Sequence, residues 1–75
     1  MNNQRRKRIE EIAEQLDALH DELYDLVHEE DEARENMPES FQGTERYEAS
    51  EEASNSLEAA ADLINDALEE LSAIE

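Results

Sequence analysis

The sequence predicts an all-α protein: an antiparallel two-helix hairpin of coiled-coil type that pairs into a four-helix bundle. Two runs of apolar residues advance by alternating steps of three and four, which places each run along one side of a helix. A short segment that holds the only proline and the only glycine separates the runs. With 75 residues, the chain is expected to form a single domain, residues 1–75.

The first helix is expected from about residue 3 to residue 34, because no proline or glycine interrupts that stretch. Its inner stripe is predicted to be Ile9, Ile12, Leu16, Leu19, Leu23, Leu26, Glu30 and Ala33. Three further residues, Ala13, His20 and Val27, border the stripe and make it wide enough for more than one neighbour. Glu30 is expected either to form a half-exposed ion pair with Arg46 or to fix the register as a polar residue in the seam.

The joint is expected at residues 35–43. Pro38 suits the start of a short helical turn, since its fixed φ matches a helix and its missing N–H needs no partner there. Gly43 suits the left-handed conformation that ends such a turn. Thr44 then provides a side-chain oxygen to cap the second helix.

The second helix is expected from about residue 44 to residue 74, with an inner stripe of Ala53, Leu57, Ala60, Ile64, Ala67, Leu71 and Ile74. Two helices of this size bury one seam, and a small scaffold seldom stabilises itself through so little core. We therefore expect a homodimer or a higher homo-oligomer, in which a second hairpin covers the remaining apolar positions. The predicted interface residues are Ala13, Val27, Leu63 and Leu68.

The charge is distributed unevenly. Asp and Glu number 23 against six Lys and Arg, for a net charge of −17, and four of the six cations stand together as Arg5, Arg6, Lys7 and Arg8. In an antiparallel hairpin this basic segment lies beside the acidic end of the chain, and mutual neutralisation there favours antiparallel topology. Alternatively, the same four residues form a candidate anion-binding site at a helix N-terminus.

Several classes of function are not expected. No cysteine is present, and no set of nucleophile, base and orienting residue is recognisable, so we expect neither a disulfide framework nor an enzyme. The pairs Asp17–His20 and Asp25–His28 have helical spacing but are predicted to point mostly outward, so no metal or other cofactor is expected. Without a long apolar stretch or a secretory signal, a cytoplasmic protein with no membrane contact is expected.

The acidic surface predicts a basic protein as partner and no direct contact with nucleic acid, because like charges repel. The candidate partner-binding carboxylates are Glu10, Glu11, Asp17, Asp21, Asp25, Glu51, Glu52, Glu58, Asp62 and Glu69. Along a helix of about 48 Å, 23 carboxylates give one per roughly 2 Å, near the density of duplex DNA. The surface is therefore consistent with mimicry of DNA, and also with simple solubility or with adaptation to a saline cytoplasm.

The joint carries one motif, Asn36-Met37-Pro38-Glu39-Ser40-Phe41-Gln42-Gly43-Thr44. With the basic start and the Leu- and Ala-rich second helix, it resembles small acidic helical-hairpin proteins of unknown function from Gram-positive bacteria, their phages and mobile elements. The resemblance implies a helical hairpin and a mobile-element setting. It implies no catalytic or binding residue.

The favoured function is therefore a non-enzymatic, acidic protein-binding module, such as an inhibitor of a host nucleic-acid-binding or defence protein. Two alternatives stay open. One is a structural module that assembles with itself and has no further ligand. The other is an oligomer that sequesters an anionic nucleotide signal through its basic N-termini.

Overall fold

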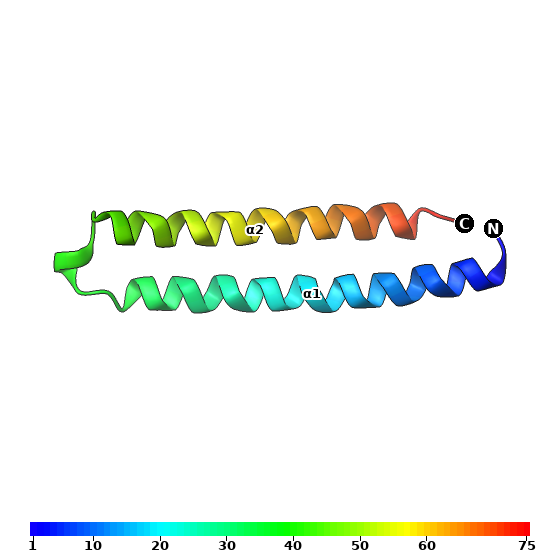
Figure 1. Cartoon of the computed structure of the whole chain (residues 1–75), viewed down its shortest axis with the longest axis horizontal. Coiled ribbons are helices and arrows are strands. Elements are labelled where there is room, and N and C mark those ends of the chain that lie inside the picture. The colour runs from blue at the N-terminus through cyan, green and yellow to red at the C-terminus, as the bar shows by residue number, and fades with distance from the viewer.

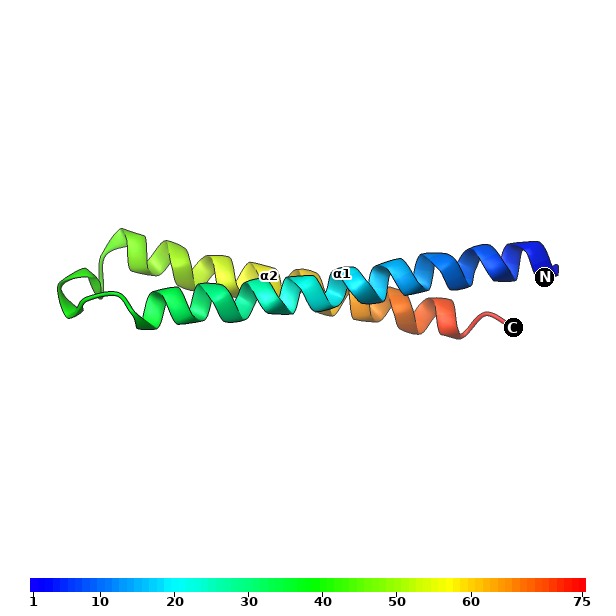
Figure 2. The same cartoon turned by 90° about the horizontal axis from the view of Figure 1, so that it is seen from below.

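The predicted two-helix hairpin is confirmed. The computed structural model describes all 75 residues. It contains helix α1 (Asn3–Glu35), a single 3₁₀ turn η1 (Glu39–Phe41) and helix α2 (Glu45–Ser72). The two long helices run antiparallel, so both termini lie at one end of a rod that measures 60 × 14 × 12 Å and the joint lies at the other (Figure 1). Viewed along the perpendicular direction, the helices cross at a shallow angle (Figure 2).

Helix α1 begins at a side-chain cap that the sequence analysis did not identify. The Asn2 Oδ1 accepts a hydrogen bond from the Arg5 backbone N–H at 2.9 Å. One of the unpaired N–H groups of the first turn is satisfied in this way. The first turn holds no acid, and Arg34 is the basic residue of the last turn, where a cation interacts favourably with the helix dipole.

The joint uses Gly43 and Thr44 as the sequence predicts. Gly43 has φ of +81°, the left-handed region that a residue with a Cβ atom enters only at a cost. The Thr44 hydroxyl donates to the Phe41 carbonyl oxygen at 2.6 Å and accepts from the Tyr47 backbone N–H at 3.4 Å. These two bonds join the short turn η1 to the start of α2.

The seam between the helices keeps one of the two rows of residues predicted for each helix and replaces the other row by its neighbour. The residues of α1 that α2 covers are Ile9, Ala13, Leu16, His20, Leu23, Val27, Glu30 and Arg34; the covered residues of α2 are Tyr47, Ser50, Ser54, Leu57, Ala61, Ile64, Leu68 and Leu71. Val27 and Ala61 are its most enclosed apolar residues, at 2% and 0% exposure. Both lists advance by alternating steps of three and four, as coiled-coil packing requires.

The prediction that Ile12, Leu19 and Leu26 lie in this seam is wrong, since they are 48%, 50% and 48% exposed. Similarly, Ala33 of α1 and Ala53, Ala67 and Ile74 of α2 are exposed, and Ser54, Ala61 and Leu68 are covered instead. The remaining predicted residue of this α2 row, Ala60, is half-buried beside Ala61. The residues three and four positions after Ile9 or Leu16 lie on the same side of a helix, so periodicity allows either row to face the partner helix. On α1 the seam row has the smaller side chain at Ala13, in place of Ile12, which lets the two helices approach closely there. On α2 the alternatives Ala60 and Ala61 have the same size, so side-chain size does not separate the two rows.

Near the joint the seam is polar. The Ser50 Oγ donates to Glu30 Oε1 at 2.8 Å, and the Ser54 Oγ donates to Asp31 Oδ1 at 2.8 Å. Arg34 donates from Nη1 to both serine hydroxyls, at 3.3 and 3.0 Å, and from Nη2 to Asp31 Oδ1 at 2.7 Å. Glu30 therefore hydrogen-bonds to a serine of α2, and the expected ion pair with Arg46 is not formed.

At the opposite end, one bond joins the two termini. Arg6 Nη2 donates to the main-chain oxygen of Glu75 at 2.6 Å. None of the basic residues 5–8 forms an ion pair with an acidic side chain, so the expected pairing of the basic segment with the acidic end of α2 reduces to this single contact. The hydrogen-bonded polar seam near the joint is thus the more extensive specific link between the helices.

Candidate functional site

The hairpin has two unlike long sides, each built from equivalent positions of both helices. In an antiparallel pair the helices are related by an approximate two-fold rotation, so equivalent positions of the repeat lie on the same side of the rod. Residues that directly follow Ile9, Leu16, Leu23, Glu30, Ser50, Leu57, Ile64 or Leu71 lie on one side. Residues that directly precede Ala13, His20, Val27, Arg34, Ser54, Ala61 or Leu68 lie on the other.

Five of the eight positions on the first side are acidic, and we call these five the acidic face: Glu10, Asp17, Asp31, Glu51 and Glu58. The other three positions are Tyr24, Asn65 and Ser72. Asp31 of α1 and Glu51 of α2 both stabilise the charge of Arg34, which raises the pKa of that guanidinium. The arrangement thus brings carboxylates from both helices together near the joint. All ten candidate partner-binding carboxylates are exposed, and four of them, Glu10, Asp17, Glu51 and Glu58, belong to this face.

The other six candidates are Glu11, Asp21, Asp25, Glu52, Asp62 and Glu69, and they lie on the outer surfaces of the two helices. Among all the carboxylates of the chain, only Asp31 pairs with an arginine side chain, at 2.7 Å from Arg34. Most of the negative charge is therefore displayed to solvent without a cation beside it. A surface of this kind attracts basic groups over a distance set by the ionic strength.

The second side is apolar, and we call it the apolar face. Each of its two rows has a spacing of seven residues: Ile12, Leu19, Leu26 and Ala33 on α1, and Ala53, Ala60, Ala67 and Ile74 on α2. No acidic residue occupies either row. Arg5 continues the first row toward its N-terminal end and Arg46 does the same for the second, because each precedes the row by seven residues.

The four predicted oligomer-interface residues fall in two different environments. Val27 is buried in the seam of the hairpin, and Ala13 and Leu68 are half-buried there. Leu63 is 69% exposed and lies between Ala60 and Ala67 on the helix surface, at the edge of the apolar face. Ile12, Leu19 and Leu26 were predicted to lie in the seam, so the row that stays open was not recognised. No local signal separates the two rows, because the seam row of Ala13, His20 and Val27 also repeats every seven residues.

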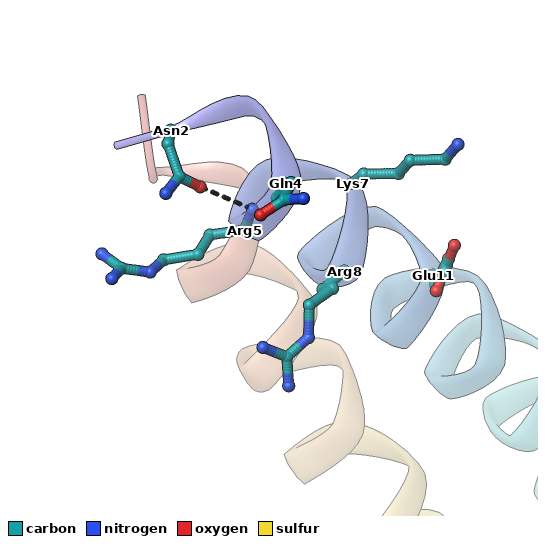
Figure 3. Close-up of a pocket in the computed structure, with 6 residues that line it drawn as sticks. All are labelled: Asn2, Gln4, Arg5, Lys7, Arg8 and Glu11. Atoms are coloured by element: carbon teal, nitrogen blue, oxygen red, sulfur yellow. Dashed lines mark hydrogen bonds between the residues drawn. The ribbon is translucent and has the colours of Figure 1, made fainter.

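The basic start of α1 borders a shallow hollow of about 480 Å³ lined by Asn2, Gln4, Arg5, Lys7, Arg8 and Glu11 (Figure 3). The charged ends of Arg5, Lys7 and Arg8 point in different directions rather than toward one point (Figure 3). The fourth member of the basic segment, Arg6, is used in the bond to Glu75. Every residue that lines the hollow is polar or charged, but the hollow has no set of donors that converge on one anion.

The histidine on the seam makes local contacts. The His20 ring is half-buried, lies 4.9 Å from the Tyr24 ring between centroids, and places its Nδ1 3.4 Å from Asp21 Oδ1. No group of three or more His, Cys, Asp or Glu side chains is arranged to hold a metal ion. Neither long helix contains an apolar stretch that reaches the length needed to cross a bilayer.

Comparison with known proteins gives no relative: no family model, no curated protein and no solved structure matches this chain. The features of the molecule that bear on function are the two long faces and the basic start of α1.

Proposed function

We propose that this protein is a non-enzymatic binding module whose acidic surface docks on the basic, nucleic-acid-binding surface of another protein. The observation that carries the proposal is the display of carboxylates by both helices on one side and on the outer surfaces of a narrow rod. With 23 carboxylates over 60 Å, the rod carries about one per 2.6 Å of its length. Duplex DNA carries about one phosphate charge per 1.7 Å.

The acidic face concentrates part of this charge on one side of the rod. Its carboxylates come from α1 and α2 together, so a basic groove that accepts the rod meets two rows of negative charge, as it does with the two strands of a duplex. The opposite, apolar side offers no such pattern. The partner is therefore expected to present Lys and Arg in an elongated groove, and its binding should weaken steeply as salt screens the charges.

A mobile-element setting, which the motif of the joint implies by resemblance, suits an inhibitor of a host nucleic-acid-binding or defence protein. Such an inhibitor needs no catalytic group, because occupation of the basic groove is enough to exclude the nucleic acid. Duplex DNA and this protein should then compete for one surface of the partner.

The test is capture from a bacterial extract at low salt on the immobilised protein, with stepwise elution by NaCl and by duplex DNA. The acidic-face variant carries Glu10→Gln, Asp17→Asn, Glu51→Gln and Glu58→Gln. A matched variant with Glu11→Gln, Asp25→Asn, Glu52→Gln and Asp62→Asn loses the same number of charges from the outer surfaces. We expect the first variant to retain much less of the DNA-displaced, basic protein than the second.

Two results would contradict the proposal. One is retention of the same proteins by the wild type and by both variants, since the acidic face would then be irrelevant. The other is a captured partner whose affinity, measured by calorimetry, is equal at low and at near-molar salt, because charge complementarity requires a loss of affinity as salt rises.

A further inference from the structure

We propose that the apolar face binds a second copy of this chain, and that the two hairpins form an antiparallel four-helix bundle with both joints at one end. The first observation is that five of the seven exposed large apolar side chains lie on the apolar face or at its edge, whereas Met1 and Phe41 lie outside it. Ile12, Leu19 and Leu26 are each about half exposed and form a single row along α1. Single exposed apolar residues are ordinary, whereas a contiguous apolar strip indicates an interaction site.

The seam residues explain why the strip lies where it does. Leu16 and Leu23 are half-buried and lie between the covered row of Ala13, His20 and Val27 and the open row. On a bundle helix a wide apolar face of this kind contacts two neighbours, one on each side of its central residues. Helix α2 is the first neighbour of α1, and the open row requires a second one.

Charge selects the face through which two copies can approach. Each copy has a net charge of −17, so contact through the acidic face or the outer surfaces places carboxylates against carboxylates. The two rows of the apolar face contain no acid and continue into Arg5 and Arg46, and the nearest carboxylates are those of Glu22, Asp25 and Glu29, which border Leu26. It is therefore the side on which a second acidic chain meets the least repulsion.

The size of the face also suits a second copy. The two rows follow the long axis of the 60 Å rod, from Ile12 to Ala33 on α1 and from Ala53 to Ile74 on α2. A second hairpin has the same length, so it covers both rows from end to end.

The sizes of the side chains select the orientation. The row on α1 is large, with Ile12, Leu19 and Leu26, whereas the facing row on α2 is small over most of its length, with Ala53, Ala60 and Ala67. If the two-fold axis runs along the rod, α1 of each copy lies against α2 of the other, and large residues pack against small ones. Leu26 then lies near Ala60 of the second copy. With the axis across the rod, leucines would meet leucines and alanines would meet alanines, which leaves gaps along the alanine rows.

The first experiment is sedimentation equilibrium at several concentrations, with circular dichroism on the same samples. We expect the wild type to have twice the 8.6 kDa mass of one chain. Leu19→Glu places a charge in the apolar face and should weaken the dimer at least tenfold. Ala18→Glu adds the same charge at the preceding residue, which lies on the exposed outer surface, and this variant should remain a dimer. A monomeric wild type, or a Leu19→Glu protein that dimerises as tightly as Ala18→Glu, would overturn the proposal.

Leu19→Glu could also unfold a hairpin that depends on its partner. A second experiment therefore uses substitutions that add no charge and leave the fold nearly unchanged. The chain has no cysteine, so two single-cysteine variants, Leu26→Cys and Ala60→Cys, can be mixed and oxidised gently. Fast formation of the mixed disulfide supports the dimer and its orientation. Oxidation no faster than in a mixture of Ala18→Cys and Ala59→Cys, both on exposed outer surfaces, contradicts them.

This inference is independent of the proposed function, since the two faces are on opposite sides of the rod. The acidic-face variant should keep the dimer mass even if it loses its basic partner. Leu26→Cys and Ala60→Cys should leave the acidic face unaltered. A failure of either proposal is thus recognised without reference to the other.

Discussion

Arg34 and Ser54 meet across the seam: Nη1 of the arginine donates to Oγ of the serine at 3.0 Å. The same hydroxyl donates to Asp31, which also accepts from Arg34, so the three side chains form a closed hydrogen-bonded set. Ser54 is almost fully buried, and no buried side-chain polar atom lacks a hydrogen-bond partner. A polar cluster of this kind holds one register of the two helices, because a shift by one turn would separate the donors from their acceptors.

Removing the Ser54 hydroxyl should destabilise the hairpin. Ser54→Ala deletes one donor to Asp31 and one acceptor for Arg34, while it also raises the intrinsic helix propensity. Ser56→Ala, at an exposed position of the same helix, has the gain in propensity without the loss of bonds. We expect Ser54→Ala to be less stable than Ser56→Ala by about 1 kcal/mol, or about 4–8 °C in the thermal midpoint followed by circular dichroism. Equal midpoints for the two variants would mean that the network contributes nothing.

The contribution of Asp31 should disappear in acid. The hydrogen bond from Ser54, followed by the one from Arg34, holds the pKa of Asp31 below its usual value of 3.8. Because the folded pKa is the lower one, the carboxylate stabilises the fold at pH values above the unfolded pKa. That stabilisation is lost as the pH falls through the folded pKa.

We therefore expect wild type to exceed Asp31→Asn in its urea midpoint at pH 7, and the difference to shrink below about pH 4. General relief of repulsion among the other acids affects both proteins alike and cancels in the difference. Asp25→Asn, at an exposed position outside the network, is the charge-matched control. A difference between wild type and Asp31→Asn that stays constant down to pH 2 would show that the network does not depend on the ionised carboxylate.

The choice of seam can be tested at adjacent alanines. Ala61 is fully buried where α2 meets α1, whereas Ala59 is exposed on the outer surface. A leucine at Ala61 adds three carbon atoms where the helices are in contact, so Ala61→Leu should cost about 1–3 kcal/mol in the free energy of unfolding. Ala59→Leu should stay within about 0.5 kcal/mol of the wild type. Chemical denaturation of both variants checks this, and an Ala61→Leu protein as stable as Ala59→Leu would show that Ala61 does not lie in the seam.

The sequence was sufficient for the elements and their caps near the joint. Residues 3–35 lack a helix breaker, Gly43 occupies the left-handed position and Thr44 supplies the capping oxygen, all of which are local properties of the chain. The Asn2 cap was also open to local reasoning, since Asn is among the preferred capping residues. For the candidate site, the sequence predicted exposed carboxylates and a supply of apolar residues beyond the needs of one seam. The prediction placed the open row of Ile12, Leu19 and Leu26 in the seam, and it placed residues of the true seam outside it.

By itself, the sequence determined two amphipathic helices, the position of the turn between them and the excess of negative charge, because each depends on neighbours within a few residues. Only the tertiary structure decided whether Ile12 or Ala13, and Ala60 or Ala61, enters the seam. Both members of each pair lie on the apolar side of their own helix, so local periodicity cannot separate them. The decision depends on how closely two helices distant in sequence can approach, and on the hydrogen bonds that Arg34 makes with Ser50 and Ser54 of the other helix. The same decision leaves the apolar face open on the side opposite the acidic one.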